Sequence, residues 1–157
     1  YKSPYSFSKW QNSEMVKFYC EMNHLPYAIT YFYNVYGGRE NCEGEFATVI
    51  AKFLERKKQN KVLQITSPGT QSRNFTYIDD TISALQLIAD KGNGDEYGIA
   101  NPKSYTINEV AKLISDKVEY VHENSANRMT SDVLIEKTCS LGWAPQTELS
   151  DYLKRKA

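Results

Sequence analysis

The spacing of hydrophobic residues divides this chain into a succession of short helices and strands. The first helical stripe has apolar side chains at positions i, i+3, i+4 and i+7: Met15, Phe18, Tyr19 and Met22. Ser3 can cap this helix and Pro4 suits its first turn, so we predict a helix from about Pro4 to Asn23. Phe7 and Trp10 add a second apolar flank. We therefore expect this helix to be covered on two sides, by its own sheet and by a partner subunit.

Further along, segments rich in β-branched and aromatic residues alternate with amphipathic segments. The pattern predicts strands at 27–35, 62–66, 74–78, 96–100 and 118–122. It predicts helices carrying residues 46–54, 134–141 and 149–153, a helix capped by Asp79 or Asp80, and a helix opened by a Thr106–Glu109 capping box. Gly142 and Trp143 are expected to stop a helix and to anchor the core. Strands that alternate with helices predict an α/β fold.

Composition and charge exclude several classes of protein. A length of 157 residues allows one domain with a sizeable core. The 19 basic residues balance the 19 acidic ones, and no apolar run approaches the roughly 20 residues of a membrane span. We therefore expect neither nucleic acid nor a membrane as partner. Cys20, Cys42 and Cys139 are widely spaced and form no CxxC pair, which predicts no metal site and a cytoplasmic location.

The clearest candidate chemistry lies on the first helix. Tyr5 and Lys9 are four residues apart, so both side chains leave the same face of the helix about one turn apart. A lysine ammonium close to a tyrosine hydroxyl favours the phenolate, which is the form able to accept a proton. The same ammonium can hold a diol such as a ribose. Because this spacing also occurs by chance on many helices, the pair needs support from the rest of the sequence.

Four segments supply that support in order along the chain: Pro4-Tyr5-Ser6-Phe7-Ser8-Lys9, residues 31–39 (Tyr-Phe-Tyr-Asn-Val-Tyr-Gly-Gly-Arg), residues 73–80 (Arg-Asn-Phe-Thr-Tyr-Ile-Asp-Asp) and Leu141-Gly142-Trp143-Ala144-Pro145. Together they resemble the C-terminal half of an extended short-chain dehydrogenase/reductase that acts on nucleotide sugars. The most similar members are NAD-dependent epimerases of the UDP-glucose 4-epimerase type. The resemblance runs from residue 1 to about residue 153.

This resemblance implies the C-terminal part of a Rossmann-type nucleotide-sugar epimerase. It would hold the last strands and helices of the parallel sheet and the small substrate-binding α/β domain. Residues 1–36 would be the last helix–strand portion of the NAD-binding domain. Residues 37–157 would be the substrate-binding domain, intermixed with the final Rossmann elements.

The resemblance also implies roles for individual residues. Tyr5 would be the catalytic base and Lys9 its electrostatic partner, and both would touch NAD, with Lys9 on its ribose. Phe32 lies where the backbone of relatives approaches the nicotinamide. The first helix joins an intersubunit bundle in relatives, which implies a homodimer.

For the substrate, a nucleotide-diphospho-sugar, the resemblance implies contacts from Asn34, Arg73 and Arg128. Arg73 matches an arginine that pairs with the diphosphate, and a guanidinium fork can bind phosphate oxygens with two hydrogen bonds. Arg128 is a candidate for a second diphosphate contact, although the usual Arg-Pro-Gly-Asp of the family is missing there. Tyr31 replaces a family arginine, and residues 67–69 (Ser-Pro-Gly) replace a Gly-Asp-Gly.

Three readings of the function stay open at this point. The first is an epimerase, the second a nucleotide-sugar 4,6-dehydratase of the same family, and the third a non-catalytic nucleotide-sugar or protein-binding module. The sequence contains no glycine-rich strand–turn–helix for the pyrophosphate of NAD. The family's catalytic serine or threonine would lie upstream of Tyr5. We therefore expect this chain alone not to turn over substrate, and we expect exposed apolar area on the first helix.

Overall fold

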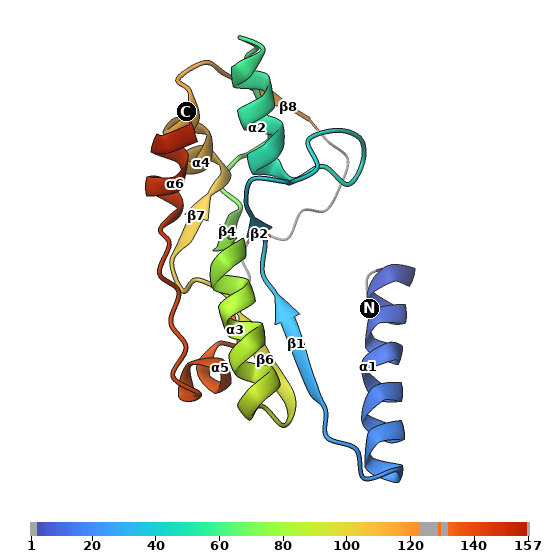
Figure 1. Cartoon of the computed structure of the whole chain (residues 1–157). Helices are drawn as coiled ribbons and strands as arrows, with labels where there is room; N and C mark the ends of the chain where they lie inside the picture. The colour runs from blue at the N-terminus through green and yellow to red at the C-terminus, as the bar shows by residue number, and fades with distance from the viewer. Residues whose placement is uncertain (1–2, 123–128, 130–131, 157) are drawn as a thin grey trace.

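The computed structural model describes residues 3–122, 129 and 132–156, and Figure 1 shows their arrangement. The helices are α1 (Pro4–Met22), α2 (Val49–Lys58), α3 (Ile78–Lys91), α4 (Ile107–Ile114), α5 (Glu136–Ser140) and α6 (Leu149–Lys156). The strands are β1 (Ala28–Phe32), β2 (Val35–Tyr36), β3 (Leu63–Thr66), β4 (Ser72–Asn74), β5 (Thr76–Tyr77), β6 (Gly94–Ile99), β7 (Ser104–Thr106) and β8 (Val118–Val121). The predicted α/β class is confirmed.

The described strands are hydrogen-bonded in pairs. β1 pairs with β6, β2 with β5 and β3 with β8, all in parallel, while β4 and β7 run antiparallel. Parallel neighbours require crossover connections, and α2, α3 and α4 all lie within these crossovers. Because the crossovers interleave, residues 34 and 73 lie close together although they are far apart in sequence.

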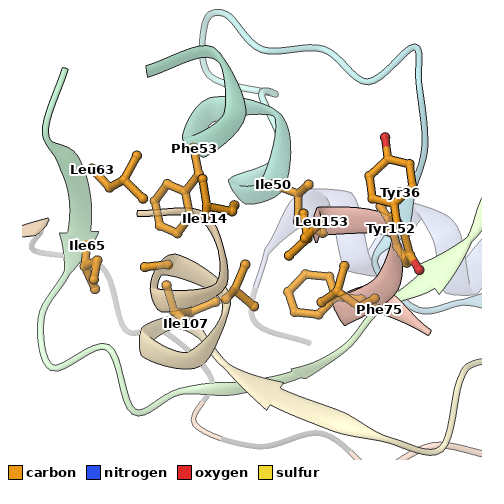
Figure 2. Close-up of a cluster of buried hydrophobic side chains, with 13 residues drawn as sticks. Tyr36, Ile50, Phe53, Leu63, Ile65, Phe75, Ile107, Ile114, Tyr152 and Leu153 are labelled. Atoms are coloured by element: carbon orange, nitrogen blue, oxygen red, sulfur yellow. The ribbon is translucent and has the colours of Figure 1, made fainter. Parts of the chain in front are cut away.

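Two hydrophobic clusters hold the folded body together. The first packs α2, α4 and α6 against β3 and the aromatic rings near β2 and β5, and Figure 2 shows its side chains meeting between these elements. The second joins α3 and β6 to the segment after α5 through Ala84, Ile88, Tyr97, Ile99 and Trp143. In Figure 1 these two groups of helices occupy opposite ends of the body. The predicted core anchor Trp143 is confirmed, and Gly142 adopts the positive φ of +96° that suits a helix stop.

The first helix stands apart from this body. α1 begins at the predicted cap, because the Ser3 hydroxyl accepts a hydrogen bond from the backbone N–H of Ser6 at 3.1 Å. None of its residues is buried, and Figure 1 shows it alongside β1, away from the other helices. The expected exposure of its apolar face is therefore confirmed.

Three expectations about the elements need correction. The strand expected over 27–35 is interrupted, because Asn34 takes a positive φ of +39° and turns the chain between β1 and β2. The second helix begins at Val49 behind a Thr48 cap, which leaves Phe46 outside it and 85% exposed. The boundaries of the other elements differ from the predicted ones by a few residues, as is usual for helix and strand ends.

The third correction concerns the expected aspartate cap. Helix α3 has Tyr77 at its N-cap position and no side-chain capping hydrogen bond. Asp80 is instead buried in the first turn, where its carboxylate accepts hydrogen bonds from the backbone N–H groups of Gln146 at 3.1 Å and Thr147 at 2.9 Å. Sequence position alone could not show this contact, because its partners lie more than sixty residues away. Asp80 thus fastens the segment before α6 to α3.

We predict that Asp80→Ala lowers the free energy of unfolding by about 2–3 kcal/mol, because the substitution removes a buried carboxyl group that accepts two backbone hydrogen bonds. Asp79→Ala is the matched control, since Asp79 is exposed in the same turn, and it should cost less than about 1 kcal/mol. Urea unfolding followed by circular dichroism measures both. Equal losses in the two variants would contradict the role assigned to Asp80.

Candidate functional site

A tight turn places Asn34 against the strand that carries Arg73. The Asn34 side-chain amide donates to the carbonyl of Asn74 at 3.0 Å, and the Asn34 carbonyl accepts from the N–H of Thr76 at 3.3 Å. The Thr76 hydroxyl donates to the carbonyl of Tyr33 at 3.1 Å. Asparagine tolerates the positive φ of this turn better than most residues. The turn is therefore clamped to β4 and β5 by three hydrogen bonds.

Asn34 and Arg73 line one cleft. Arg73 lies in β4 opposite Tyr105 of β7, is partly buried, and donates from Nη1 to the carbonyl of Ser72 at 2.7 Å. The cleft has a volume of about 730 Å³ and is bounded by the 42–49 segment, α2, β3 and the end of β8. This volume is in the range of small-molecule and cofactor sites. The structure thus brings together two of the three predicted substrate residues.

The charged side chains of the cleft are mixed. Lys52, Arg56 and Arg73 supply positive charge, and Glu43 and Glu55 supply negative charge. Arg56 donates from Nε to the carbonyl of Val62 at 2.6 Å, which holds its guanidinium at the cleft wall. Three cations beside neutral amides can receive an anionic ligand that also carries hydrogen-bonding groups.

One wall of the cleft is a loop that an acidic residue braces. Glu40 accepts hydrogen bonds from the Thr48 hydroxyl at 2.5 Å and from the backbone N–H of Gly37 at 3.1 Å. Burial raises the pKa of the Glu40 carboxyl, and these two hydrogen bonds oppose the shift. The brace ties the turn after β2 to the start of α2, and so shapes the wall that Cys42 and Val49 contribute.

The predicted pair on α1 stays together but lies outside this cleft. The Lys9 ammonium is 5.8 Å from the centre of the Tyr5 ring, and Tyr5 is 70% exposed. Neither residue lines the 730 Å³ cleft. Phe32, at the end of β1, is 56% exposed. Arg128 lies outside the described residues.

A group of polar residues that sequence reasoning missed holds α1 to the body. Asp95 of β6 pairs with Lys17 of α1 and accepts a hydrogen bond from the Tyr31 hydroxyl at 2.8 Å. Burial alone would raise the pKa of Asp95, but hydrogen bonds from Lys17, from the N–H of Glu96 and from Tyr31 lower it overall. Burial, followed by the hydrogen bond to Asp95, raises the pKa of Tyr31 to about 12. Asp95 therefore sets the orientation of the helix that carries Tyr5 and Lys9.

The donors present suit one end of a dinucleotide. The Lys9 ammonium and the exposed Tyr5 ring lie on the same side of α1, and Phe32 is also exposed. No group of three potential His, Cys, Asp or Glu metal ligands occurs among the described residues. The same residues contain no helix long and apolar enough to cross a membrane.

Comparison with known proteins identifies the family. The family model described as the NAD dependent epimerase/dehydratase family matches residues 1–101. The chain belongs to this family. A Methanocaldococcus jannaschii protein named for UDP-glucose 4-epimerase is 32% identical over 98% of the chain and 52% of its own length. The human dTDP-D-glucose 4,6-dehydratase is 30% identical over 98% of the chain and 47% of its own length.

Solved structures of family members share the fold. The UDP-N-acetylglucosamine 4-epimerase of Methanobrevibacter ruminantium aligns with a TM-score of 0.91 and 26% identity, over 99% of this chain and 52% of its own. The Thermotoga maritima UDP-glucose 4-epimerase, solved with UDP-glucose, aligns with a TM-score of 0.86 and 28% identity over 97% and 51%. The predicted fold, part of a Rossmann-type nucleotide-sugar epimerase, is confirmed. The chain spans about half the length of the curated relatives it matches.

Proposed function

We propose that this chain carries the nucleotide-sugar site of an NAD-dependent nucleotide-sugar epimerase whose whole length is about twice that of the chain. The observation that carries the proposal is the meeting of Asn34 and Arg73 in one cleft. Relatives named as nucleotide-sugar epimerases support it, and one solved neighbour binds UDP-glucose. The division into an NAD-binding portion (1–36) and a substrate-binding portion (37–157) is part of this proposal.

The chemistry of the cleft suits a nucleoside diphosphate. The Arg73 guanidinium can pair two of its N–H groups with diphosphate oxygens, which a lysine ammonium does as a point charge only. Asn34 lines the same cleft and offers a short polar side chain to the sugar nucleotide. Arg128 would add a second diphosphate contact. A charge-assisted hydrogen bond of this kind contributes about 1.5–3 kcal/mol.

We therefore predict that the chain binds UDP-glucose and that Arg73→Ala weakens this binding about tenfold or more. Isothermal titration calorimetry measures both affinities. Arg39→Ala is the matched control, because Arg39 is an exposed arginine that does not line the cleft, and it should leave the affinity unchanged. Equal affinities of the Arg73→Ala variant and the unaltered chain would contradict the diphosphate role.

We also propose that Tyr5 and Lys9 carry the acid–base chemistry of the whole protein. The Tyr5 phenolate would take the proton of a sugar hydroxyl, and the neighbouring Lys9 ammonium would stabilise the phenolate. Bound NAD would supply the hydride acceptor. Tyr5 would later return the proton as an acid, while Lys9 and Phe32 hold the nicotinamide ribose end of the cofactor in place.

In the whole protein, Tyr5→Phe should lower turnover by at least about a hundredfold, because the substitution removes the acid–base hydroxyl. Substrate binding should stay within a few-fold, since Tyr5 does not line the substrate cleft. Steady-state turnover of UDP-glucose and equilibrium binding measure the two effects. Tyr19→Phe on an exposed position of the same helix is the control. Normal turnover by Tyr5→Phe would falsify the acid–base assignment.

Two observations favour alternative functions, a dehydratase and a non-catalytic binding module. The 30% identity to the human dTDP-D-glucose 4,6-dehydratase favours a dehydratase as the second candidate, and formation of a product that has lost water distinguishes it from an epimerase. The position of Tyr5 outside the 730 Å³ cleft favours a non-catalytic binding module. Such a module would keep the affinity for nucleotide sugars and lose all turnover in the whole protein.

Finally, we propose that α1 takes part in a homodimer. Met15, Phe18, Tyr19 and Met22 form a continuous apolar stripe, and all four are exposed. A stripe of this kind on a helix surface marks an interaction site. Sedimentation velocity of the chain should show a concentration-dependent dimer that Phe18→Glu shifts to monomer, whereas Lys58→Glu, at an exposed position of α2, should not. A monomer at every concentration would contradict the proposal.

A further inference from the structure

Two buried side-chain atoms among the described residues have no hydrogen-bond partner: the hydroxyl oxygen of Tyr36 and Oε1 of Gln71. The Tyr36 ring belongs to an aromatic cluster with Tyr77 and Tyr152, at centroid distances of 5.5 Å and 5.0 Å. Of these two residues, only Gln71 lines the 730 Å³ cleft. Gln71 therefore belongs to the wall of the proposed nucleotide site.

The geometry around Gln71 determines which end of its amide lacks a partner. Nε2 donates to the carbonyl of Thr66 at 3.1 Å, which directs the nitrogen toward β3 and leaves Oε1 as the free acceptor. The backbone carbonyl of Gln71 accepts from the N–H of Ile107 at 3.1 Å, so the main chain is also fixed. Gln71 is 4% exposed. The side chain is therefore held in place from two directions.

An acceptor in this position is unusual for a native protein. A buried polar atom without a partner costs about 1–3 kcal/mol, and the large majority of buried side-chain polar atoms are paired. Oε1 is closed to solvent in the described structure, so a ligand donor reaches it only where binding moves the atoms that cover it. A ligand that donates a hydrogen bond to Oε1 would satisfy this acceptor, and a ligand without that donor would leave it unpaired. The side-chain carbonyl can therefore contribute to ligand recognition.

We propose that Gln71 is a specificity-determining residue whose Oε1 accepts a hydrogen bond from the nucleoside part of the bound ligand. This assignment rests on the proposed function, since it takes the cleft to be the nucleotide site. Arg73, two residues further along in β4, then holds the diphosphate while Gln71 selects the nucleoside. A uridine diphosphate has three neutral donors there: the base imide N–H and the two ribose hydroxyls.

The test compares UDP with N3-methyl-UDP, 2′-deoxy-UDP and 3′-deoxy-UDP, each of which removes one of these donors. Titration calorimetry of the unaltered chain should show that one analogue binds about tenfold more weakly than UDP. Gln71→Met removes the acceptor at similar volume. This variant should bind UDP about tenfold more weakly and should lose its discrimination against that one analogue.

Gln64→Met is the matched control. Gln64 lines the same cleft, but its amide already donates to Glu119 at 2.9 Å, so affinity and discrimination should both persist. The comparison of UDP with its analogues on the unaltered chain tests the assignment even if the Gln71→Met variant does not fold. Equal binding of all four nucleotides by the unaltered chain would overturn the assignment, as would full affinity and discrimination in Gln71→Met. Absence of UDP binding by the unaltered chain would instead contradict the proposed function itself, and this assignment with it.

Discussion

The hydrogen bonds between the Asn34 turn and the β4–β5 segment are the constraint on which the candidate site depends. They hold Asn34 and Arg73 at one cleft although the two residues are separated by the whole of α2 and β3. Thr76 joins this network to the rest of the body, because its hydroxyl donates to Tyr33 and accepts from the N–H of Asn101. Thr76 is fully buried, so its hydrogen bonds are shielded from water. The Asn34–Arg73 side of the cleft is therefore anchored to the core, while the 42–49 loop forms another wall.

The helix with the proposed acid–base pair is held in a different way. No residue of α1 is buried, and polar contacts centred on Asp95 fasten it to β6. Parallel strands are normally covered on both faces, and β1 pairs only with β6 among the described strands. The exposed apolar stripe of α1 and this edge of β1 are surfaces that further protein would cover. The relatives, which are about twice as long as the chain, are consistent with this reading.

The sequence predicted much of this fold because its elements are marked by local signals. The Ser3 cap, the Thr106–Glu109 box and the helical spacing of α1 depend on residues close in sequence, and the structure has all three. The predictions of an uninterrupted strand and of an aspartate cap were wrong for the same reason. Asn34 and Asp80 form hydrogen bonds with segments that are distant in the sequence. Asn34 and Arg73 could be named from the resemblance to a family. Gln71, Glu40 and Asp95 could not, because their importance arises only when β3, α2 and α1 are in place.

The most direct test of the central claim is a crystal structure of the chain with UDP-glucose bound. Our account predicts that the diphosphate lies within hydrogen-bonding distance of the Arg73 guanidinium, with the Asn34 side chain contacting the sugar nucleotide in the same cleft. A nucleotide bound elsewhere on the chain, with the cleft between α2, β3 and β4 unoccupied, would contradict it.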